Sequence, residues 1–138
     1  MREILFRGKR LDSGEWIEGW YEPEVDVGSC SYHCGVTIAC KNSEGWLDDH
    51  EVDPATVGQY TGLTDENGKK VFEGDIVRFR TRTCTFKPVY VRWDEETARF
   101  LVSASDGVRS YPMDRTWKYE VIGNIHDNPE LLEGVIDA

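Results

Sequence analysis

The sequence has no long hydrophobic run and little alanine or leucine. No apolar stretch approaches the roughly 20 residues that cross a bilayer, and the alternating start, Met1 to Arg7, is too short for a signal-peptide core. These absences predict a soluble, cytoplasmic protein with no membrane contact. Aromatic residues make up 12% of the chain, including five tryptophans, and such a composition favours strands over long helices.

Basic charge is also scarce, because 16 Lys and Arg stand against 26 Asp and Glu, for a formal charge of −10. An acidic surface repels a phosphate backbone, so general nucleic-acid binding is disfavoured. The deficit is uneven, however. Residues 76–93 hold five basic and no acidic side chains, so the rest of the chain carries −10 minus +5, or −15.

The four cysteines form no recognised metal or catalytic motif. The thiolates and imidazoles that could supply a zinc shell are Cys30, His33, Cys34, Cys40 and His50. Their spacing lacks the paired Cys-x-x-Cys knuckle, so reduced thiols packed as small hydrophobes are the favoured interpretation. A thiol–imidazole pair is the further alternative, although no nucleophile lies in a recognisable elbow. We expect no catalytic residue, no metal and no cofactor.

Turn signals divide the chain into two parts. A hairpin is predicted for residues 1–22, and a third strand for residues 35–40, followed by a turn at 42–45. Asp53 and Pro54 predict the N-cap and first residue of a one-turn helix. We place the organisational boundary after Gly58, between an N-terminal β unit of residues 1–58 and a second unit of residues 59–138.

The second unit is organised around the stretch from Gln59 to Arg82. Asn67-Gly68 predicts a tight hairpin turn, and Glu73-Gly74-Asp75 a second bend. Beyond that bend, two apolar side chains alternate with two arginines, the period of a strand with one buried face. The alternating residues are Val77, Arg78, Phe79 and Arg80.

The strands that follow complete an all-β prediction. Residues 88–93 are expected to turn Val89, Val91 and Trp93 inward, and residues 98–102 to turn Phe100 and Val102 inward. Pro112 indicates a short edge piece, and residues 119–125 a last strand. Strands at spacings of about ten residues favour a small barrel or sandwich, and residues 127–133 predict a short C-terminal helix.

Two long motifs resemble those of a known family. Residues 61–77, T-G-L-T-D-E-N-G-K-K-V-F-E-G-D-I-V, are similar to the central signature of the YopX family of phage and prophage proteins, and residues 119–132 to its C-terminal signature. Arg7 to Arg10, Gly14 to Trp16 and Val57 to Tyr60 resemble its N-terminal half. The resemblance implies a C-terminal SH3-like β-barrel. It supplies no catalytic residue, because no activity is established for the family.

The candidate binding site is the basic strip within residues 76–93. Three arginines at every second residue project from one strand face, and two more residues lie on the outer face of the next strand. The five are Arg78, Arg80, Arg82, Tyr90 and Arg92. We expect the strip to contact acidic surface of the N-terminal part or of another copy. Phosphate or single-stranded nucleic acid is the alternative ligand.

The tryptophans are expected mainly in the core, with Trp46 and Trp117, next to turns, as the two that can be exposed.

Together the composition, the lack of a catalytic motif, the basic strip and the family resemblance predict a non-enzymatic phage or prophage accessory protein that binds a host or phage protein and self-associates. A nucleic-acid-binding module and a small metal-dependent or thiol enzyme are the two alternatives.

Overall fold

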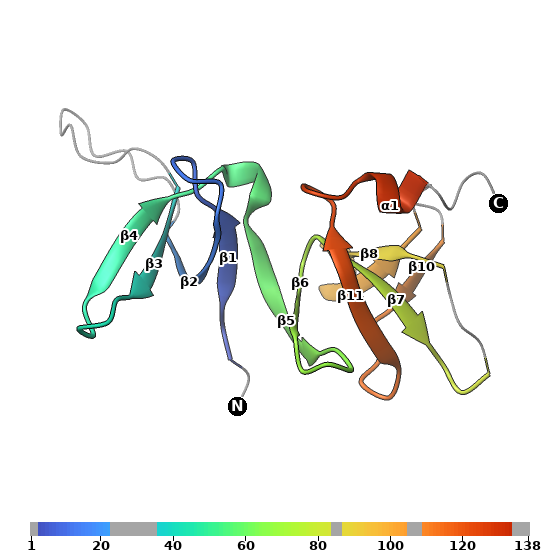
Figure 1. The fold of residues 1–138 in the computed structure, drawn as a ribbon. Helices are drawn as coiled ribbons and strands as arrows, with labels where there is room; N and C mark the ends of the chain where they lie inside the picture. The colour runs from blue at the N-terminus through green and yellow to red at the C-terminus, as the bar shows by residue number, and fades with distance from the viewer. Residues whose placement is uncertain (1–2, 23–35, 84–86, 105–108, 134–138) are drawn as a thin grey trace. The chain divides into compact units, whose positions relative to one another are not determined.

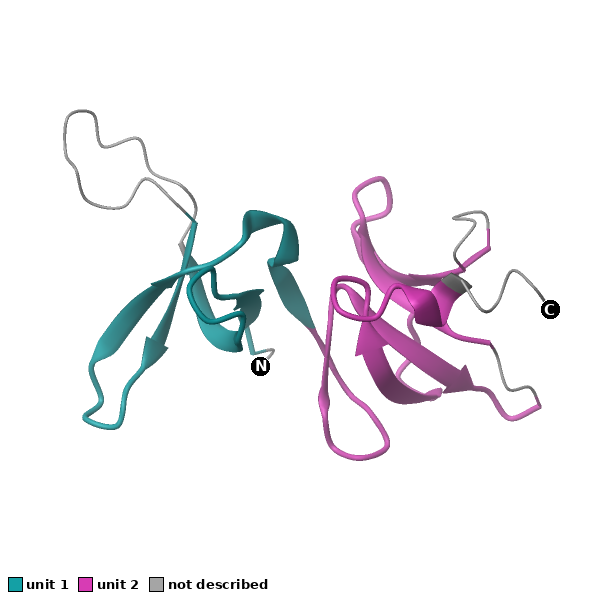
Figure 2. Ribbon diagram, turned by 45° about the horizontal axis from the view of Figure 1, so that its top comes forward, with its two compact units in different colours: residues 1–60 teal, residues 61–138 magenta. Residues whose placement is uncertain are grey.

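A computed structural model describes residues 3–22, 36–83, 87–104 and 109–133 (Figure 1). Its described part contains eleven strands in two antiparallel sheets, one 3-10 turn and one short helix, which confirms the all-β prediction. No helix in these ranges is long and apolar enough to span a membrane. The chain divides into two compact units, residues 1–60 and 61–138 (Figure 2). The boundary expected after Gly58 falls within the same strand as this division.

The first unit holds strands β1 to β4 and the start of β5. The antiparallel sheet that contains them has the strand order β4-β3-β2-β1-β5-β6, so β4 is the first strand in this order. The core of the unit is a cluster of Val36, Ile38 and Val52, packed by three partly buried neighbours. The predicted hairpin and third strand are present, and residues 47–51 form a further strand. The elements are β1 (Phe6–Lys9), β2 (Trp16–Glu22), β3 (Thr37–Lys41), β4 (Leu47–Glu51), η1 (Pro54–Thr56) and β5 (Gly58–Thr64).

The predicted helix start at Asp53 is confirmed as the 3-10 turn η1. The Asp53 carboxylate accepts a hydrogen bond from the Ala55 N–H at 3.1 Å, which satisfies a donor that the turn itself leaves unpaired. Pro54 lies at the first position, where no N–H is needed.

The second unit is a five-stranded sheet in the order β10-β9-β8-β7-β11. In the described residues β10 and β11 are its two edges, so no closed barrel is formed. The predicted edge piece at Pro112 and the terminal helix are both confirmed. The elements are β6 (Lys70–Phe72), β7 (Asp75–Arg80), β8 (Val89–Asp94), β9 (Arg99–Ser103), β10 (Ser110–Pro112), β11 (Lys118–Asn124) and α1 (Glu130–Glu133).

One face of this sheet carries the core of the unit. The buried cluster consists of Val71, Val77, Phe79, Val89, Val91, Val102 and Tyr119. It confirms five of the residues expected inward from alternation, and Phe100 packs against it while partly buried. Trp117 stacks on Phe79 with ring centroids 5.2 Å apart, and it is therefore half-buried. Trp93 lies on the predicted face, opposite Phe100, which packs against the cluster. It nevertheless remains 39% exposed at the end of the sheet, where its ring packs edge-on against Phe100.

Two further tryptophans test the expectation of burial. Trp46 is 69% exposed, as expected from its place beside a turn. Trp20 was expected in the core but is 51% exposed. It pairs with Ala39, on the sheet face opposite to the one that carries the buried Ile38.

The opposite face of the second sheet is covered at the end where β7 begins. A side chain at Gly123 would lie 2.7 Å from Asn128 Oδ1 and 2.9 Å from Leu131 Cδ1, so the segment leading into α1 packs closely on β11 there. Ile76, the register partner of Gly123 on β7, is fully buried. Two and four residues further along β7, Arg78 and Arg80 are exposed. This uncovered end of the face holds the candidate site.

Candidate basic binding surface

The site begins with the alternation of β7. Val77 and Phe79 are fully buried while Arg78 and Arg80 are exposed, as the sequence predicted. In the antiparallel register of β7 with β11, Lys118 lies opposite Arg80 and Glu120 lies opposite Arg78. Directly opposite residues share one face of a sheet, so Lys118 joins the arginines. We call Arg78, Arg80, Arg82 and Lys118 the basic surface.

The turn between β5 and β6 is fastened beside this surface. Asp65 Oδ1 accepts from the backbone N–H groups of Asn67 and Lys69, and its Oδ2 accepts from the Val121 N–H on β11 at 3.0 Å. The next residue, Glu66, donates its own backbone N–H to the Tyr119 carbonyl at 2.9 Å. The turn is therefore held along β11 at two consecutive residues.

The hydrogen bonds of Asp65 also determine its charge state. Burial of the carboxyl opposes ionisation and by itself would raise its pKa. The backbone N–H donors of Val121, Lys69 and Asn67 outweigh that effect, so the pKa of Asp65 lies below its usual value. Asp65 is therefore an ionised fastening of the turn at neutral pH.

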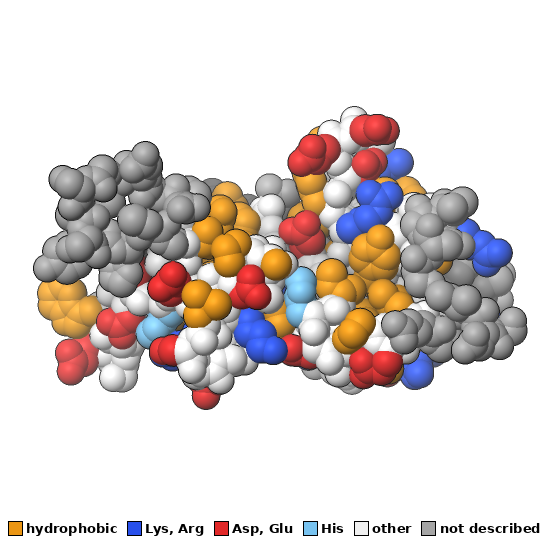
Figure 3. All heavy atoms as spheres, turned by 90° about the horizontal axis from the view of Figure 1, so that it is seen from above, with side chains coloured by type: hydrophobic (Ala, Val, Ile, Leu, Met, Phe, Trp, Pro, Cys, Tyr) orange, Lys and Arg blue, Asp and Glu red, His pale blue; other side chains and the backbone are white. Residues whose placement is uncertain are grey.

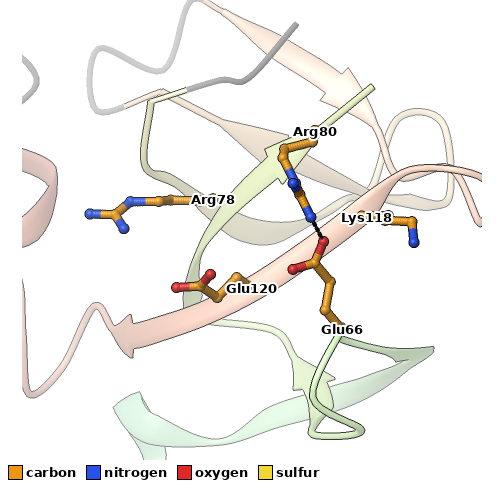
Figure 4. Close-up of a pocket in the computed structure, with 5 residues that line it drawn as sticks. All are labelled: Glu66, Arg78, Arg80, Lys118 and Glu120. Atoms are coloured by element: carbon orange, nitrogen blue, oxygen red, sulfur yellow. Dashed lines mark hydrogen bonds and ion pairs between the residues drawn. The ribbon is translucent and has the colours of Figure 1, made fainter. Parts of the chain in front are cut away.

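Because the turn is fixed, Glu66 meets the basic surface. Its carboxylate forms an ion pair with the Arg80 guanidinium, and the two side chains point toward one another in Figure 4, whereas Arg78 and Lys118 extend away from that pair. The side chains of Arg78, Arg82 and Lys118 make no hydrogen bond or ion pair with the residues that the structure describes. Like charges directly opposite in a sheet are destabilising, so the Arg80–Lys118 pair opposes stability.

Two shallow hollows adjoin on this surface and share Arg80 and Lys118. One, of about 240 Å³, is completed by Glu66, Arg78 and Glu120. The other, of about 310 Å³, is completed by Thr81, Arg82 and Thr116 and has no carboxylate in its lining. Ligand pockets usually enclose most of a small molecule, whereas these hollows are open. They suit charged side chains presented by another macromolecule.

The structure separates the predicted strip into two parts. Arg92, on β8, lies opposite Leu101 of β9. Its guanidinium donates hydrogen bonds to Ser103 Oγ at 2.8 Å and to Ser110 Oγ at 3.3 Å. Tyr90, the register partner of Ile76, is half-buried. At about 3.3 Å per residue, Arg78 and Arg92 lie at opposite ends of the β7–β8 pair. Arg92 therefore contributes to the packing of β8, β9 and β10 and stands apart from the basic surface.

Three residues of the site were missed by the sequence reasoning: Glu66, Lys118 and Glu120. The alternation in Lys118-Tyr119-Glu120-Val121 did indicate that Lys118 and Glu120 share a face. It did not indicate that β11, about 40 residues away in sequence, pairs with β7. No local pattern predicted the position of Glu66, which depends on the same pairing.

The zinc and thiol candidates are only partly described. Cys30, His33 and Cys34 lie outside the described residues. Within the described ranges no group of three or more His, Cys, Asp or Glu is placed to hold a metal ion. Burial raises the pKa of the Cys40 thiol, and the neighbouring Asp48 raises it further. A nucleophilic thiol requires the opposite shift.

Elsewhere the charges are mixed. On the face drawn in Figure 3, acidic, basic and hydrophobic side chains are interspersed over both units. The basic surface, with two arginines on β7, Arg82 just beyond the end of β7, and Lys118 on β11, is therefore a concentration of positive charge on a chain whose formal charge is −10.

Comparison with known proteins places the chain in a family. The crystal structure of protein EF1440 from Enterococcus faecalis is similar, with a TM-score of 0.51 and 24% sequence identity over 96% of this chain and 99% of that one. At that identity the likeness concerns the fold alone. No curated protein matches. The family described as YopX protein matches residues 5–133, nearly the whole chain. This chain belongs to the YopX protein family.

Proposed function

We propose that this chain is a non-enzymatic phage or prophage accessory protein that binds acidic protein surfaces, those of its own copies included, through the basic surface. The observation that carries the proposal is the exposure of Arg78, Arg82 and Lys118, whose side chains have no polar partner among the described residues. Arginine pairs well with carboxylates at protein contacts. A basic surface on one protein and an acidic surface on another orient the two proteins as they meet.

The proposal includes an SH3-like arrangement for the second unit, as the family resemblance implied. The single core on one face of five antiparallel strands supports that arrangement. In such a small β scaffold the fold by itself assigns no activity, so we assign the proposed binding to the basic surface.

Nucleic-acid binding is the second candidate, and the carboxylate-free hollow around Arg82 favours it. Three observations place it below protein binding. Arg92 and Tyr90 are separated from the arginines of β7, Glu66 and Glu120 lie among the cations, and the chain carries a charge of −10. Each of the three weakens attraction to a phosphate backbone.

The third candidate, a thiol enzyme, has the least support. Cys40 is the cysteine that the structure describes, and burial and Asp48 keep its thiol protonated at neutral pH by raising its pKa. A reactive cysteine needs a cationic environment that lowers this pKa.

The proposal is tested by competition between two polyanions. A fluorescein-labelled Asp/Glu-rich peptide is titrated with the protein at low salt, and unlabelled peptide or single-stranded DNA of equal charge is then added. We expect the peptide to bind and to displace the label more effectively than the DNA. The Arg78→Glu/Arg80→Glu variant should lose this binding.

The matched control is Lys41→Glu/Arg99→Glu, which makes the same change in net charge at exposed positions outside the basic surface. This variant should lose much less affinity than Arg78→Glu/Arg80→Glu, because the net charge changes equally in both but the cations that contact the peptide remain. Absence of peptide binding, equal loss in both variants, or preference for DNA would overturn the proposal.

A further inference from the structure

A second charged strand lies in the first unit. β4 is the first strand in the order of its sheet, and its acidic side chains are exposed. Asp49 pairs with Ala39, and Glu51 pairs with Thr37. The two carboxylates therefore project from the same face, and neither makes a hydrogen bond or ion pair with the residues that the structure describes.

The acidic pair and the basic surface have matching spacing. Asp49 and Glu51 are two residues apart on one strand, as are Arg78 and Arg80. Side chains two residues apart on a strand are separated by about 7 Å. Two carboxylates can therefore meet two guanidiniums at once, and several pairs in register bind more strongly than isolated surface pairs.

Apolar side chains beside the acidic pair give the contact more area. Leu47 lies on the same face of β4 as Asp49 and is 56% exposed. Trp46, the residue before it, is 69% exposed. Exposed large apolar groups next to charged ones are typical of protein contacts, where tryptophan and arginine are enriched.

We propose that Asp49 and Glu51 of one copy bind the basic surface of a second copy. This inference rests on the proposed function and names one occupant of the site. The occupant is another copy because the same chain carries both complementary partners. The carboxylates of Asp49 and Glu51 have no polar partner among the described residues, and neither do Arg78, Arg82 and Lys118 of the basic surface, whereas Arg80 is held by Glu66. The two surfaces differ, so the contact is heterologous, and repeating it joins copies head to tail.

Neutralising each surface separately tests this contact. One variant, Arg78→Gln/Arg80→Gln, loses part of the basic surface, and the other, Asp49→Asn/Glu51→Gln, loses the acidic pair. The mass of each species is measured by light scattering at low ionic strength over a range of concentrations. We expect wild-type protein to form dimers and longer oligomers, and each variant alone to associate at least about tenfold more weakly.

The equimolar mixture of the two variants gives the decisive result. Each variant retains the surface that the other lacks, so one contact forms for each pair of chains. The mixture should therefore reach a dimer and stop there. A contact that used the same surface on both copies would not recover on mixing.

The control variant Glu95→Gln/Glu96→Gln removes two exposed acids from the turn after β8 and should associate like wild type. A wild-type protein that stays monomeric at every concentration, or a mixture no heavier than its components, overturns the inference. If the acidic peptide still binds the basic surface in that case, the proposed function stands with a different partner. Loss of both results removes the proposed function as well.

Discussion

At the scale of single residues, Asp65 links the two ends of the second unit. Its carboxylate receives two N–H groups from its own turn and one from Val121, 56 positions along the chain. Hydrogen bonds to an ionised group are stronger than those between neutral groups. The residue is 7% exposed, so water cannot easily replace these bonds.

Replacing this carboxylate should destabilise the fold in a pH-dependent way. In Asp65→Asn one amide N–H₂ meets a backbone N–H that needs an acceptor, so we expect a loss of about 1–3 kcal/mol in the free energy of unfolding at pH 7. The wild-type pKa is lowered by folding. The stabilisation is therefore complete above the unfolded value of about 3.9 and declines as the pH falls through the lower folded value.

Urea denaturation of wild type and Asp65→Asn at several pH values measures this difference. The difference should be constant near neutrality and should shrink in acid. Glu95→Gln, at an exposed position in the turn after β8, should change stability by less than about 0.5 kcal/mol. A pH-independent difference for Asp65→Asn would contradict an ionised fastening.

Glu66 has a different role, because it already occupies part of the basic surface. Its carboxylate is bound by Arg80, so it competes with any acidic ligand for that guanidinium. We expect Glu66→Gln to raise the affinity for the labelled acidic peptide by about threefold to tenfold, in keeping with one removed surface ion pair. Lower affinity in the anisotropy titration would show that Glu66 supports the site. Glu44→Gln, in an exposed turn of the first unit, is the control.

At the scale of elements, local sequence predicted the strands well and their pairing poorly. The alternation in β7, the Asn67-Gly68 turn and the Asp53-Pro54 helix start depend on neighbouring residues, and all three are confirmed. The position of Lys118 opposite Arg80 depends on which strands pair. Strand pairing is set by packing across the whole unit, which periodicity does not record.

The same limit explains the exposure of Trp93. Leu101, on the face of β9 opposite to Val102, is 5% exposed, so that face is not uniformly solvated. Trp93 was placed inward because it follows Val89 and Val91 at even spacing. The core cluster does not extend that far along β8. Alternation with a period of two predicts which face of the sheet a residue lies on. It does not predict how far along that face other parts of the protein bury the side chains.

A substitution of Arg92 tests whether the two ends of the sheet have different roles, one in stability and the other in binding. Its Nε donates to Ser103 Oγ, and Ser103 also contacts Ser110 Oγ at 2.8 Å. Ser103 is fully buried, so Arg92→Leu should cost about 1–3 kcal/mol of stability by leaving the hydroxyl network incomplete. Affinity for the acidic peptide should remain within about twofold of wild type, because distant exposed charges are screened.

Chemical denaturation and peptide anisotropy on the same preparation measure both effects of Arg92→Leu. A variant of normal stability that fails to bind the peptide would restore Arg92 to the binding strip. The matched comparison is Arg78→Leu, which is exposed on β7. It should show the reverse pattern, with stability near wild type and weaker binding.

At the scale of the whole molecule, the distribution of charge matters more than its total. A net charge of −10 keeps copies apart at long range. Local attraction between the basic surface and carboxylates acts only within a screening length of about 10 Å at 0.1 M salt. Association by this surface therefore requires close, oriented contact, and it should weaken as salt is added.

The central claim is that the basic surface binds acidic surfaces of proteins. It is tested most directly by titrating the labelled acidic peptide with wild-type protein and with Arg78→Glu/Arg80→Glu across a salt series. The account predicts wild-type affinity that falls steadily with salt, and affinity for the variant at least about tenfold weaker at low salt. Equal affinities for the two proteins, or wild-type affinity independent of salt, would contradict it.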